Sequence, residues 1–488
     1  MKQLSNILKD VTILELSGSN DFTVNNIQYD SRKVLPGDLF VAIKGEAFDG
    51  HDFIEAAVER GAQAVVYETA GSEIPVHAVR VSNTRKALAL MAGALFDHPG
   101  KSMELIGITG TNGKTSTAYL IDNILRQGGK EAGLLGTISY RSGTETCPAK
   151  WTTPDALELH HHLSLMRENG MNVCIMEVSS HALDQCRIEG LDIKLAVFTN
   201  LSQDHLDYHR SMEYYAEAKQ RLFQQVDSQK GENIINRDDP VGHSMAEQNH
   251  RPVLFYSVEK GKADVFPASV HYTRDGIQAG LNTPAGNVLI DTKLVGQHNL
   301  YNIMAAVCAG IAMKIPTATI EQGISATPIV PGRLEPVSAG QPFKVMVDYA
   351  HTPDAMENVI DAVRPLVKGR LFVVFGCGGD RDRGKRPLMG AIGEEKTDRA
   401  ILTSDNPRTE DPQQIIDDVL TGIRNREKVE VIPDRTEAIH AALDSAESDD
   451  WILLLGKGHE TYQVLGTRKI DYDDRAVAYD HLKKRYQN

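Results

Sequence analysis

The sequence lacks any apolar run long enough to cross a membrane, and its amino terminus, MKQLSNILKDV, lacks an apolar stretch followed by a cleavage site. It also lacks a basic excess, because 52 Lys and Arg residues against 66 Asp and Glu residues leave a net charge of −14. This balance argues against a general nucleic-acid-binding protein but permits local basic pockets for anionic ligands. We therefore expect a cytoplasmic protein that neither binds nucleic acid nor inserts into a membrane.

Cysteine is scarce, and its spacing excludes the usual structural uses of the residue. The five cysteines are odd in number and scattered, with no Cys-x-x-Cys pair and no Cys/His metal spacing: Cys147, Cys174, Cys186, Cys308 and Cys377. Unpaired thiols fit a reducing compartment. Short repeats and low-complexity segments are missing as well.

The chain is too long for one hydrophobic core, and its pattern changes along its 488 residues. Residues 1–99 mix short strands and helices, including a helix expected at 51–60, and the breaker cluster DHPG at 97–100 predicts a linker. Residues 100–332 and 333–488 each alternate strands with helices, which indicates largely parallel sheets. We predict an α/β protein of three domains, with a central phosphate-loop (P-loop) ATPase domain and a C-terminal Rossmann-like domain.

The C-terminal domain shows the alternation most clearly. Its strands are expected at 344–347, 371–375, 400–403, 429–432 and 451–455. Its helices are expected at 354–367, 413–423 and 436–446. Strands and helices in strict alternation are typical of a doubly wound sheet. The glycine cluster at 376–379 is not G-x-G-x-x-G, so the pattern favours no dinucleotide site.

The most specific motif is GITGTNGKTS at 107–116, between a predicted strand at 105–108 and a predicted helix. In such a loop the backbone N–H groups and the helix N-terminus bind phosphate. Lys114 can reach the β- and γ-phosphates, and the Thr115 hydroxyl can join a Mg²⁺ shell. A strict Walker A motif would have glycine at 108, where isoleucine stands. The alternative, a glycine-rich turn with a surface lysine, explains less of the strand–loop–helix context.

Polar side chains follow the next two predicted strands. Glu177 ends the strand at 173–177, where a carboxylate would point into the ligand crevice of an open sheet and could bind Mg²⁺ directly or through water. The alternative is a solvated strand end. The following loop, 198–209, contains two acids and two histidines. That composition suits cation or phosphate binding, and it is equally common on polar surfaces, so spacing alone leaves its role open.

At this point the sequence resembles the Mur ligase family, which shares its plan with folylpolyglutamate synthetase. The matching motifs run in order through nearly the whole chain: GTNGKTS at 110–116, TTP at 152–154, EVSSHAL at 177–183, TNLSQDHLDYH at 199–209, GQHNLYN at 296–302, GR at 332–333 and DYAHTPD at 348–354. Four further motifs resemble the members that join an amino acid to UDP-N-acetylmuramoyl-L-alanyl-D-glutamate: DSR at 30–32, GCGGDRD at 376–382, DNPR at 405–408 and GKGHE at 456–460.

The resemblance implies a role for each domain. Domain 1–99 would bind the uridine nucleotide, with Ser31 as the matching contact. Domain 100–332 would bind ATP and the dipeptide end of the substrate. The matching ATP contacts are Gly110, Thr111, Asn112, Gly113, Lys114, Thr115, Ser116, Asn299, Asn302, Arg333 and Asp348. The matching UDP-dipeptide contacts are Thr152, Thr153, Ser179, Gln185 and Arg187.

The resemblance also implies a metal and catalytic set. Its catalytic members would be Lys114, Glu177, His205 and Lys219, and its metal ligands Thr115, Glu177, His205 and Lys219. Lys219, on a helix predicted at 212–223, matches the lysine that the family carbamylates. The residues themselves give no hint of that modification, because a helix lysine usually lies on a solvated face. The carbamate therefore rests on the resemblance alone.

The choice of amino acid should lie in domain 333–488. Asp405, Asn406, Pro407 and Arg408 follow the strand predicted at 400–403. An arginine fork pairs with a carboxylate, and meso-diaminopimelate has a second carboxylate that L-lysine lacks. Family members with DNPR generally use diaminopimelate, whereas lysine-adding members depart from that motif. Arg381, Gly456 and Glu460 match further contacts, Glu460 to an ammonium group. The alternative for Arg408 is a surface turn residue.

Together these features predict an ATP-dependent, ADP-forming acid–amino-acid ligase of peptidoglycan precursor synthesis, and hence of cell-wall biogenesis, cell shape and cell division. It would add meso-2,6-diaminopimelate to the D-glutamyl γ-carboxylate through an acyl phosphate. We expect Mg²⁺ as the cofactor and a monomeric protein. The alternatives are the L-lysine-adding member, folate polyglutamylation, and a P-loop switch protein or transport ATPase. The last explains the Gly-Lys-Thr run but not a third, Rossmann-like domain.

Overall fold

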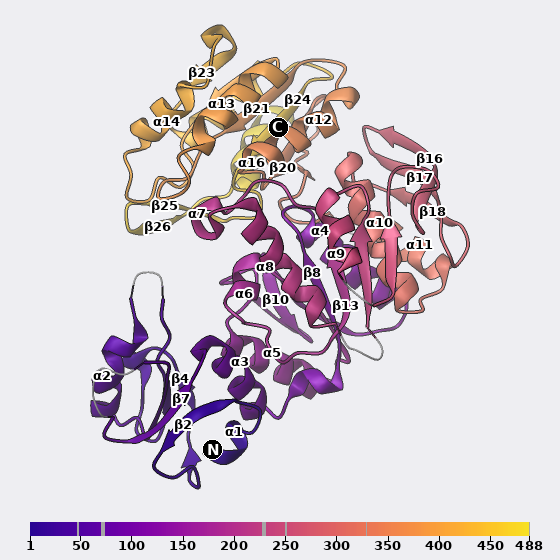
Figure 1. Ribbon diagram of the computed structural model, residues 1–488. Coiled ribbons are helices and arrows are strands. Elements are labelled where there is room, and N and C mark those ends of the chain that lie inside the picture. The colour runs from indigo at the N-terminus through magenta and orange to yellow at the C-terminus, as the bar shows by residue number, and fades with distance from the viewer. Residues whose placement is uncertain (46–47, 70–73, 227–230, 249–250, 328, 488) are drawn as a thin grey trace.

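The computed structural model describes residues 1–45, 48–69, 74–226, 231–248, 251–327 and 329–487. Figure 1 shows three domains in chain order, the N-terminal one in indigo, the central one in magenta and the C-terminal one in orange to yellow. Each domain has its own sheet and its own buried apolar clusters. The predicted three-domain α/β class is therefore confirmed, and the boundaries near residues 99 and 332 remain our proposal.

The N-terminal domain is built on a five-stranded sheet of order β2-β7-β6-β5-β4, in which only β2 is antiparallel to its neighbour. Its strands are β2 (Ile13–Ser17), β4 (Ile27–Gln28), β5 (Leu39–Val41), β6 (Ala64–Tyr67) and β7 (His77–Val81), with a separate pair β1 (Lys2–Gln3) and β3 (Thr23–Val24). Its helices are α1 (Leu4–Ile7), α2 (Ile54–Glu59) and α3 (Thr84–Leu95). Asn83 caps α3 by accepting from the Lys86 N–H.

The central domain has an eight-stranded sheet of order β11-β10-β9-β12-β8-β13-β14-β15, in which the six strands from β9 to β15 in this order run parallel. The strands are β8 (Glu104–Thr109), β9 (Ala132–Leu135), β10 (Ser139–Ser142), β11 (Glu145–Pro148), β12 (Val173–Glu177), β13 (Ile193–Phe198), β14 (Glu232–Asn236) and β15 (Val253–Tyr256). The helices are α4 (Lys114–Gln127), α5 (Ala156–Glu168), α6 (Ser180–Asp184), α7 (Leu206–His209), α8 (Met212–Gln224), α9 (Pro240–Glu247), α10 (Gln297–Ala312) and α11 (Thr317–Ser325).

Both faces of this central sheet are covered, which explains its continuous apolar strands. Successive side chains point to opposite faces. Ile106 on β8 therefore packs with α4, α10 and α11, whereas its neighbour Leu105 packs with α5 and α8. The two layers hold β8, and the loop that follows it, in the middle of the sheet.

A three-stranded antiparallel sheet follows the central one and was not predicted. It consists of β16 (Phe266–Thr273), β17 (Gly276–Asn282) and β18 (Val288–Thr292). In β18 the residues alternate between buried and exposed, which is the pattern of a strand with one wet face. Its hairpin tip contacts the C-terminal domain, since Arg274 donates to Asp449 at 2.6 Å and Lys344 donates to Asp275 at 2.9 Å.

The C-terminal domain has a six-stranded sheet of order β19-β20-β24-β21-β22-β23, parallel except for β19. Its strands are β19 (Glu335–Pro336), β20 (Lys344–Asp348), β21 (Leu371–Phe375), β22 (Arg399–Leu402), β23 (Val429–Val431) and β24 (Trp451–Leu455), with a hairpin of β25 (Tyr462–Leu465) and β26 (Arg468–Asp471). Its helices are α12 (Pro353–Val363), α13 (Lys385–Lys396), α14 (Pro412–Leu420), α15 (Arg435–Ser445) and α16 (Asp474–Tyr486).

Two helices differ from their predictions because of local backbone chemistry. The helix predicted at 354–367 ends at Val363 and continues only as a 3₁₀ turn, Arg364–Leu366, because Pro365 has no N–H to donate. The helix predicted at 51–60 begins instead as a 3₁₀ turn, Gly50–Phe53, and becomes α-helical at Ile54. Neither change moves a predicted site residue.

The sheet order decides where the ligand-binding loops meet. In the central sheet β12, β8 and β13 are neighbours, and in the C-terminal sheet β24, β21 and β22 are neighbours. The loops after these strands carry the conspicuous motifs, and loops at the carboxyl ends of parallel strands line the ligand crevice.

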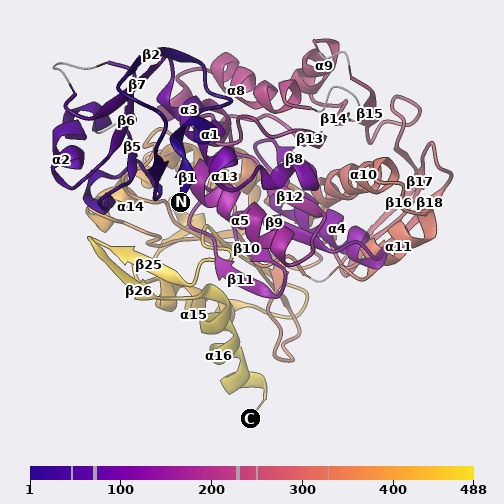
Figure 2. The ribbon, with the colours of Figure 1, turned by 90° about the horizontal axis from the view of Figure 1, so that it is seen from below.

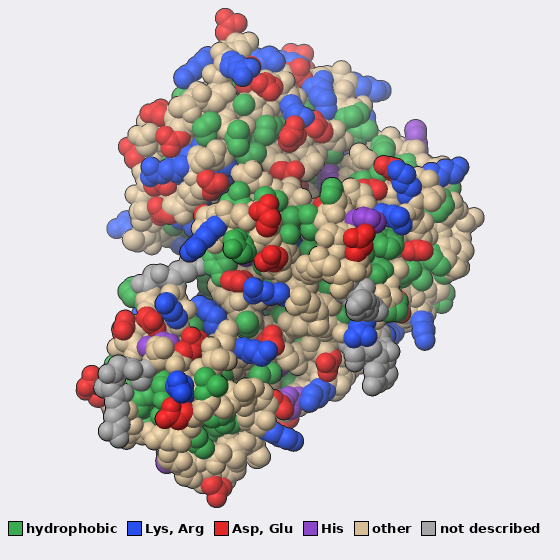
Figure 3. Space-filling view, viewed as in Figure 1, with side chains coloured by type: hydrophobic (Ala, Val, Ile, Leu, Met, Phe, Trp, Pro, Cys, Tyr) green, Lys and Arg blue, Asp and Glu red, His purple; other side chains and the backbone are tan. Residues whose placement is uncertain are grey.

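Figure 3 shows the molecule hollowed between its N-terminal and C-terminal domains, and Figure 2 shows α16 projecting at the C-terminus. None of the helices in the described ranges combines the length and apolarity that crossing a membrane requires.

Candidate active site

The P-loop connects β8 to α4 as the sequence predicts. At two of its positions the backbone conformation and the space available favour glycine. Gly110 has φ +147° and Gly113 has φ +86°, both in the region that favours glycine. A Cβ on Gly110 would lie 1.9 Å from Thr199 Oγ1, and one on Gly113 would lie 2.3 Å from Asn302 Oδ1. The backbone of the loop therefore packs directly against the side chains of Thr199 and Asn302. The N-terminus of α4 faces a cleft.

Two lysines meet at one carbonyl of this loop. Lys114 Nζ donates to the carbonyls of Gly110 and Thr111 at 2.8 and 2.9 Å. Lys219, from the middle of α8, donates to the same Gly110 carbonyl at 2.9 Å. Burial lowers the pKa of both lysines, and for Lys219 the charge of Lys114 lowers the pKa further, well below the ordinary value. Lys219 is thus a buried amine whose positive charge is disfavoured by burial and by the neighbouring Lys114.

Glu177 lies opposite the start of α4. Its carboxylate accepts from Thr115 Oγ1 at 2.9 Å, from the Thr137 N–H at 2.9 Å and from Thr137 Oγ1 at 3.0 Å. The side chain is buried, and a Cβ on Gly136 would lie 2.4 Å from its Oε1. The strand end that could have been solvated is therefore packed beside the P-loop.

This donor set suits a hard cation. The Thr115 hydroxyl and the Glu177 carboxylate present oxygen atoms side by side, which is what Mg²⁺ prefers. Within the described ranges, no group of three or more His, Cys, Asp or Glu side chains is arranged to hold a metal ion. One hydroxyl and one carboxylate are a donor set of the kind that Mg²⁺ uses when phosphate oxygens and water supply its other ligands.

The cleft above the P-loop has a volume of about 730 Å³ and joins the central and C-terminal domains. Arg333 and Asp348 line it from the start of the C-terminal domain. Arg333 Nη2 donates to Thr115 Oγ1 at 3.2 Å, so this arginine reaches the phosphate loop across the domain boundary. Asp348 accepts from the backbone N–H groups of Leu334 and Ala350, and burial raises the pKa of its carboxyl group.

Two asparagines of α10 lie one turn apart beside this cleft. Asn302 lines the cleft, whereas Asn299 lies behind it and accepts from Asn302 Nδ2 at 3.1 Å. Asn299 in turn donates to the Val295 carbonyl at 2.8 Å. Both are buried. Asn299 therefore orients Asn302 in this structure.

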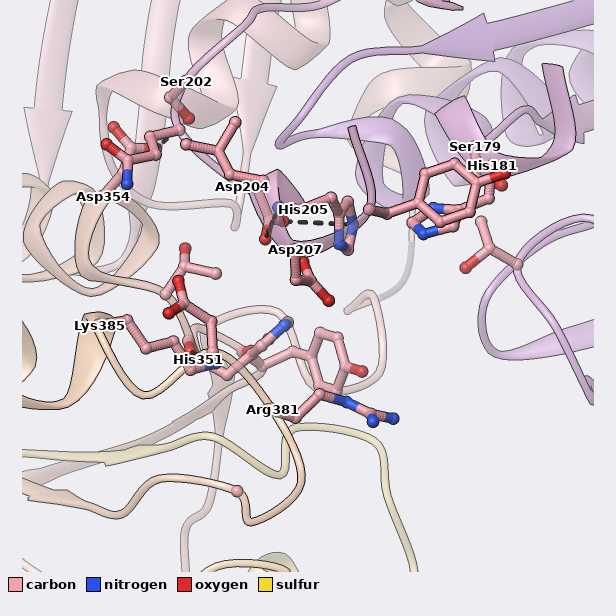
Figure 4. A pocket seen from close by; sticks show the side chains of 18 of the residues that line it. Ser179, His181, Ser202, Asp204, His205, Asp207, His351, Asp354, Arg381 and Lys385 are labelled. Atoms are coloured by element: carbon pink, nitrogen blue, oxygen red, sulfur yellow. Dashed lines mark hydrogen bonds and ion pairs between the residues drawn. The ribbon is translucent and has the colours of Figure 1, made fainter. Parts of the chain in front are cut away.

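A second, larger cleft of about 1440 Å³ is lined by residues of all three domains. Figure 4 shows Asp204 and His205 on one side of it, with His205 3.4 Å from Asp204. Arg381 and Lys385 of the C-terminal domain lie on the other side. Burial lowers the pKa of His205, and Asp204 opposes that effect. The loop after β13 is therefore part of the cleft wall.

The central-domain wall of this cleft is preorganised by hydrogen bonds. Thr153 Oγ1 donates to the Glu177 carbonyl at 2.8 Å and accepts from the Ser179 N–H at 3.0 Å. Arg187 donates to the Thr153 carbonyl at 2.6 Å and to Gln185 Oε1 at 2.8 Å. All five predicted UDP-dipeptide contacts of this domain line the cleft: Thr152, Thr153, Ser179, Gln185 and Arg187. Ser31 lies in the N-terminal domain, on the 3₁₀ turn Ser31–Lys33, outside the described lining of this cleft.

The C-terminal wall is formed by the loops after β21, β22 and β24. Six of the predicted amino-acid contacts line it: Arg381, Asp405, Asn406, Arg408, Gly456 and Glu460. Pro407 lies behind the lining, where a Cβ on Gly379 would be 1.9 Å from its carbonyl oxygen. Arg408 has φ +52°, which is uncommon outside glycine. Its Nη1 donates to the Gly379 carbonyl at 2.7 Å and its N–H to the Val464 carbonyl at 3.1 Å.

Several residues of this wall were missed by the sequence analysis. The hairpin β25–β26 supplies Gln463, which donates to the Asp405 carbonyl at 2.5 Å, and Val464, which donates to Asn406 Oδ1 at 2.9 Å. Lys457 and Lys385 were also missed, although Lys457 stands inside the GKGHE motif. Only that motif could have drawn attention to it, because a lysine in a glycine-rich loop is usually exposed.

Comparison with known proteins agrees with this geometry. Residues 108–310 match the Mur ligase middle domain, residues 332–458 match the Mur ligase glutamate ligase domain, and residues 23–95 match the Mur ligase family catalytic domain. The chain belongs to the Mur ligase family. This membership confirms the resemblance inferred from the motifs and makes the chain an ATP-dependent ligase.

Curated relatives of this ligase match it over nearly its whole length. The UDP-N-acetylmuramoyl-L-alanyl-D-glutamate–2,6-diaminopimelate ligase of Oceanobacillus iheyensis is 44% identical, covering 99% of this chain and 99% of that protein. The protein of the same name from Geobacillus thermodenitrificans is 46% identical, covering 94% of this chain and 95% of that protein.

Solved structures give the same result. A structure of a UDP-N-acetylmuramoyl-L-alanyl-D-glutamate–2,6-diaminopimelate ligase is 32% identical, with a TM-score of 0.70 and 100% of each chain covered. The MurF ligase of Thermotoga maritima in complex with ADP is 20% identical, with a TM-score of 0.61, 95% of this chain covered and 97% of that chain. The second likeness shows the fold alone.

Proposed function

We propose that this Mur ligase joins meso-2,6-diaminopimelate to the D-glutamyl γ-carboxylate of UDP-N-acetylmuramoyl-L-alanyl-D-glutamate, with ATP converted to ADP and phosphate. The observation that carries the proposal is the three-domain cleft, whose walls bring Arg408 and Glu460 together with the dipeptide contacts of the central domain. Relatives at 40–46% identity that carry the name of this activity support it. The reaction would serve peptidoglycan precursor synthesis in the cytoplasm, and we expect the ligase to act as a monomer.

The first step activates the carboxylate. The D-glutamyl γ-carboxylate attacks the γ-phosphorus of ATP, ADP leaves, and an acyl phosphate forms. Two anions must approach each other, so positive charge near the phosphates lowers the barrier. The N–H groups of residues 110–116 would hold the phosphates, and Lys114 would turn from the Gly110 carbonyl toward them. Arg333, already 3.2 Å from Thr115, would approach from the C-terminal domain.

Magnesium would be held by Thr115 and Glu177, with His205 and a carbamylated Lys219 near a second ion. When bound, Mg²⁺ supplies charge neutralisation for the phosphates. The lowered pKa of the buried Lys219 amine supports the modification, because only an unprotonated amine can add CO₂ to form a carbamate. The carbamate would replace a buried amine by oxygen atoms, the ligand type that Mg²⁺ accepts.

The second step forms the amide bond. The amino group of diaminopimelate attacks the acyl carbon, and phosphate leaves from the tetrahedral intermediate. The chain's contribution is positioning: Arg408 would pair with the distal carboxylate and Glu460 with the distal ammonium group. Arg381, opposite His205 in the cleft, would contribute a further positive charge. L-lysine lacks the distal carboxylate, so the lysine-adding alternative leaves Arg408 without a partner.

The deciding experiment is phosphate release with ATP, the UDP-muramoyl dipeptide and a panel of amino acids. We expect release only when both the dipeptide and meso-diaminopimelate are present, and poor release with L-lysine. Lys114→Ala should abolish release without loss of the fold, because it removes a charge beside the reacting phosphates. A wild-type preference for L-lysine would overturn the substrate assignment. Near-normal release by a folded Lys114→Ala variant would overturn the P-loop assignment.

A further inference from the structure

Lys457 is a completely buried lysine directly behind the amino-acid end of the cleft. It follows β24 in a tight turn between Gly456, with φ +110°, and Gly458, with φ +52°. Its Nζ donates to Glu460 Oε2 and to Asn406 Oδ1, both at 3.2 Å. A charge without solvent costs free energy unless it is paired, and both of these partners belong to the cleft wall.

The three side chains form one small network. Asn406 Nδ2 donates to Glu460 Oε2 at 3.0 Å, so Lys457 and Asn406 converge on the same carboxylate oxygen. The other oxygen, Oε1, has a long contact of 3.5 Å from the Tyr462 hydroxyl. Asn406 is itself fixed by the Val464 N–H at 2.9 Å. The Glu460 carboxylate is thus held through Oε2 by Lys457 and Asn406.

Lys457 and Glu460 differ in their position relative to the cleft, and this difference indicates different roles. Glu460 and Asn406 line the cleft, whereas Lys457 has no exposed surface at all. Lys457 can therefore reach a substrate only through Glu460 or Asn406. Packing alone does not explain a lysine at this position, because an apolar side chain of similar volume usually stabilises a buried site as well as an ion pair does.

We propose that Lys457 is a positioning residue that fixes the Glu460 carboxylate, through its Oε2, so that Oε1 meets the distal ammonium group of the amino-acid substrate. The inference rests on the proposed function, since it assumes that Glu460 receives that ammonium group. It separates two parts of recognition in the same pocket. Arg408 acts on the distal carboxylate, which only diaminopimelate has, whereas Lys457 acts on the ammonium group, which diaminopimelate and L-lysine share.

The test is Lys457→Met, which keeps the length of the side chain and removes its charge. We expect KM for meso-diaminopimelate to rise roughly 10- to 100-fold, corresponding to the loss of one charge-assisted contact, with a smaller change in kcat. KM for L-lysine should rise by a similar factor, and KM for ATP should stay constant. Lys428→Met is the matched control, because Lys428 belongs to the same domain, contacts the Glu394 carbonyl and lies outside the described lining of both clefts.

A double-mutant cycle distinguishes positioning from general destabilisation. If Lys457 acts through Glu460, then Lys457→Met should add little to the KM of Glu460→Gln, whereas independent effects would multiply. Lys457→Arg, which keeps a positive charge, should recover part of the loss. If Lys457→Met does not fold, Lys457→Gln is the variant that removes the charge from the Glu460 contact. Multiplying effects, or an unchanged KM in a folded Lys457→Met protein, would overturn the inference. A wild-type protein without diaminopimelate-dependent phosphate release would overturn the proposed function instead.

Discussion

At the residue scale, burial decides the chemistry of several polar side chains. Lys219 and Lys114 share the Gly110 carbonyl, so two amines are kept close together where only one positive charge is easily accommodated. Burial is the largest cause of the lowered pKa of Lys219, and Lys114 is the second. Perturbed residues of this kind cluster at functional sites, where their protonation state has a task.

The first prediction concerns Lys219. Lys219→Ala should reduce kcat by about 100-fold or more, because it removes the proposed carbamate beside the reacting phosphates. Added short carboxylates such as acetate or formate should restore part of the activity by supplying the missing oxygen atoms. The measurement is phosphate release with and without these acids, together with the mass of the intact wild-type protein under native, CO₂-containing conditions. Full activity in Lys219→Ala would contradict the role.

The second prediction concerns Arg408, whose backbone is held at φ +52°. Arg408→Ala should lower kcat/KM for meso-diaminopimelate by roughly 30-fold to several-thousand-fold, since losing one side of a buried charge pair costs about 2–5 kcal/mol. The weak activity with L-lysine should change much less. Because Arg408 also donates to the Gly379 carbonyl, an equal loss with both amino acids would mean that it supports the loop rather than the substrate.

At the element scale, one buried arginine ties two loops of the C-terminal sheet to helix α14. Arg386, on α13, donates to both oxygens of Glu410 at 2.9 and 3.0 Å and to Asp418 of α14 at 2.7 Å. Glu410 also accepts from the Asp380 N–H at 2.5 Å. The loop after β21 and the loop after β22 are thereby held against each other, and both contribute residues to the cleft.

The third prediction follows from the hydrogen bonds between Arg386 and Glu410. Hydrogen bonds from Arg386 lower the pKa of Glu410 from 4.5 to about 2. A lowered pKa stabilises the fold above the unfolded value of about 4.5, and the contribution disappears as the pH falls through about 2. Glu410→Gln should therefore lower the free energy of unfolding by about 1–3 kcal/mol at neutral pH and have a shrinking effect below pH 4.5. Urea unfolding of both proteins across this range measures the difference, and a pH-independent difference would contradict the assignment.

At the scale of the whole molecule, two of the contacts between the central and C-terminal domains involve different elements, apart from the one that Arg333 makes to Thr115. Asp354, in the first turn of α12, accepts from Asn112 Nδ2 at 2.7 Å and from Ser202 Oγ at 2.6 Å. The second contact lies at the β16–β17 tip, where Arg274 meets Asp449 at 2.6 Å. Figure 4 shows Asp354 beside Ser202 at the edge of the large cleft. The contact from Asn112 links the P-loop itself to the neighbouring domain.

The fourth prediction tests this arrangement. Asp354→Ala and Arg274→Ala should each increase the radius of gyration in the absence of substrates, and the double variant should increase it most, because the two contacts lie at different places on the interface. Small-angle X-ray scattering measures the change. Arg399→Ala, which breaks an ion pair with Glu430 inside the C-terminal domain, is the control. Unchanged scattering by the double variant would mean that other contacts hold the domains.

Features that depend on local backbone chemistry and periodicity can be read directly from the amino-acid sequence. The P-loop glycines, the apolar strands of the central sheet and the order of motifs at strand ends were all readable, because each is specified within a few residues. The family membership followed from the same motifs. The roles of the individual site residues remain predictions.

The contacts between side chains that are distant in the sequence could be found in the folded chain alone. Asn112 and Asp354 are 242 positions apart, and Lys457 meets an asparagine 51 positions before it. Lys219 looks like an ordinary helix lysine in the sequence and is fully buried beneath the P-loop in the fold. The sheet β16–β18 and the hairpin β25–β26 were missed because their strands have exposed residues and lack the continuous apolar runs that marked the buried strands. Such pairings are set by the packing of whole elements against each other, and no local pattern encodes that packing.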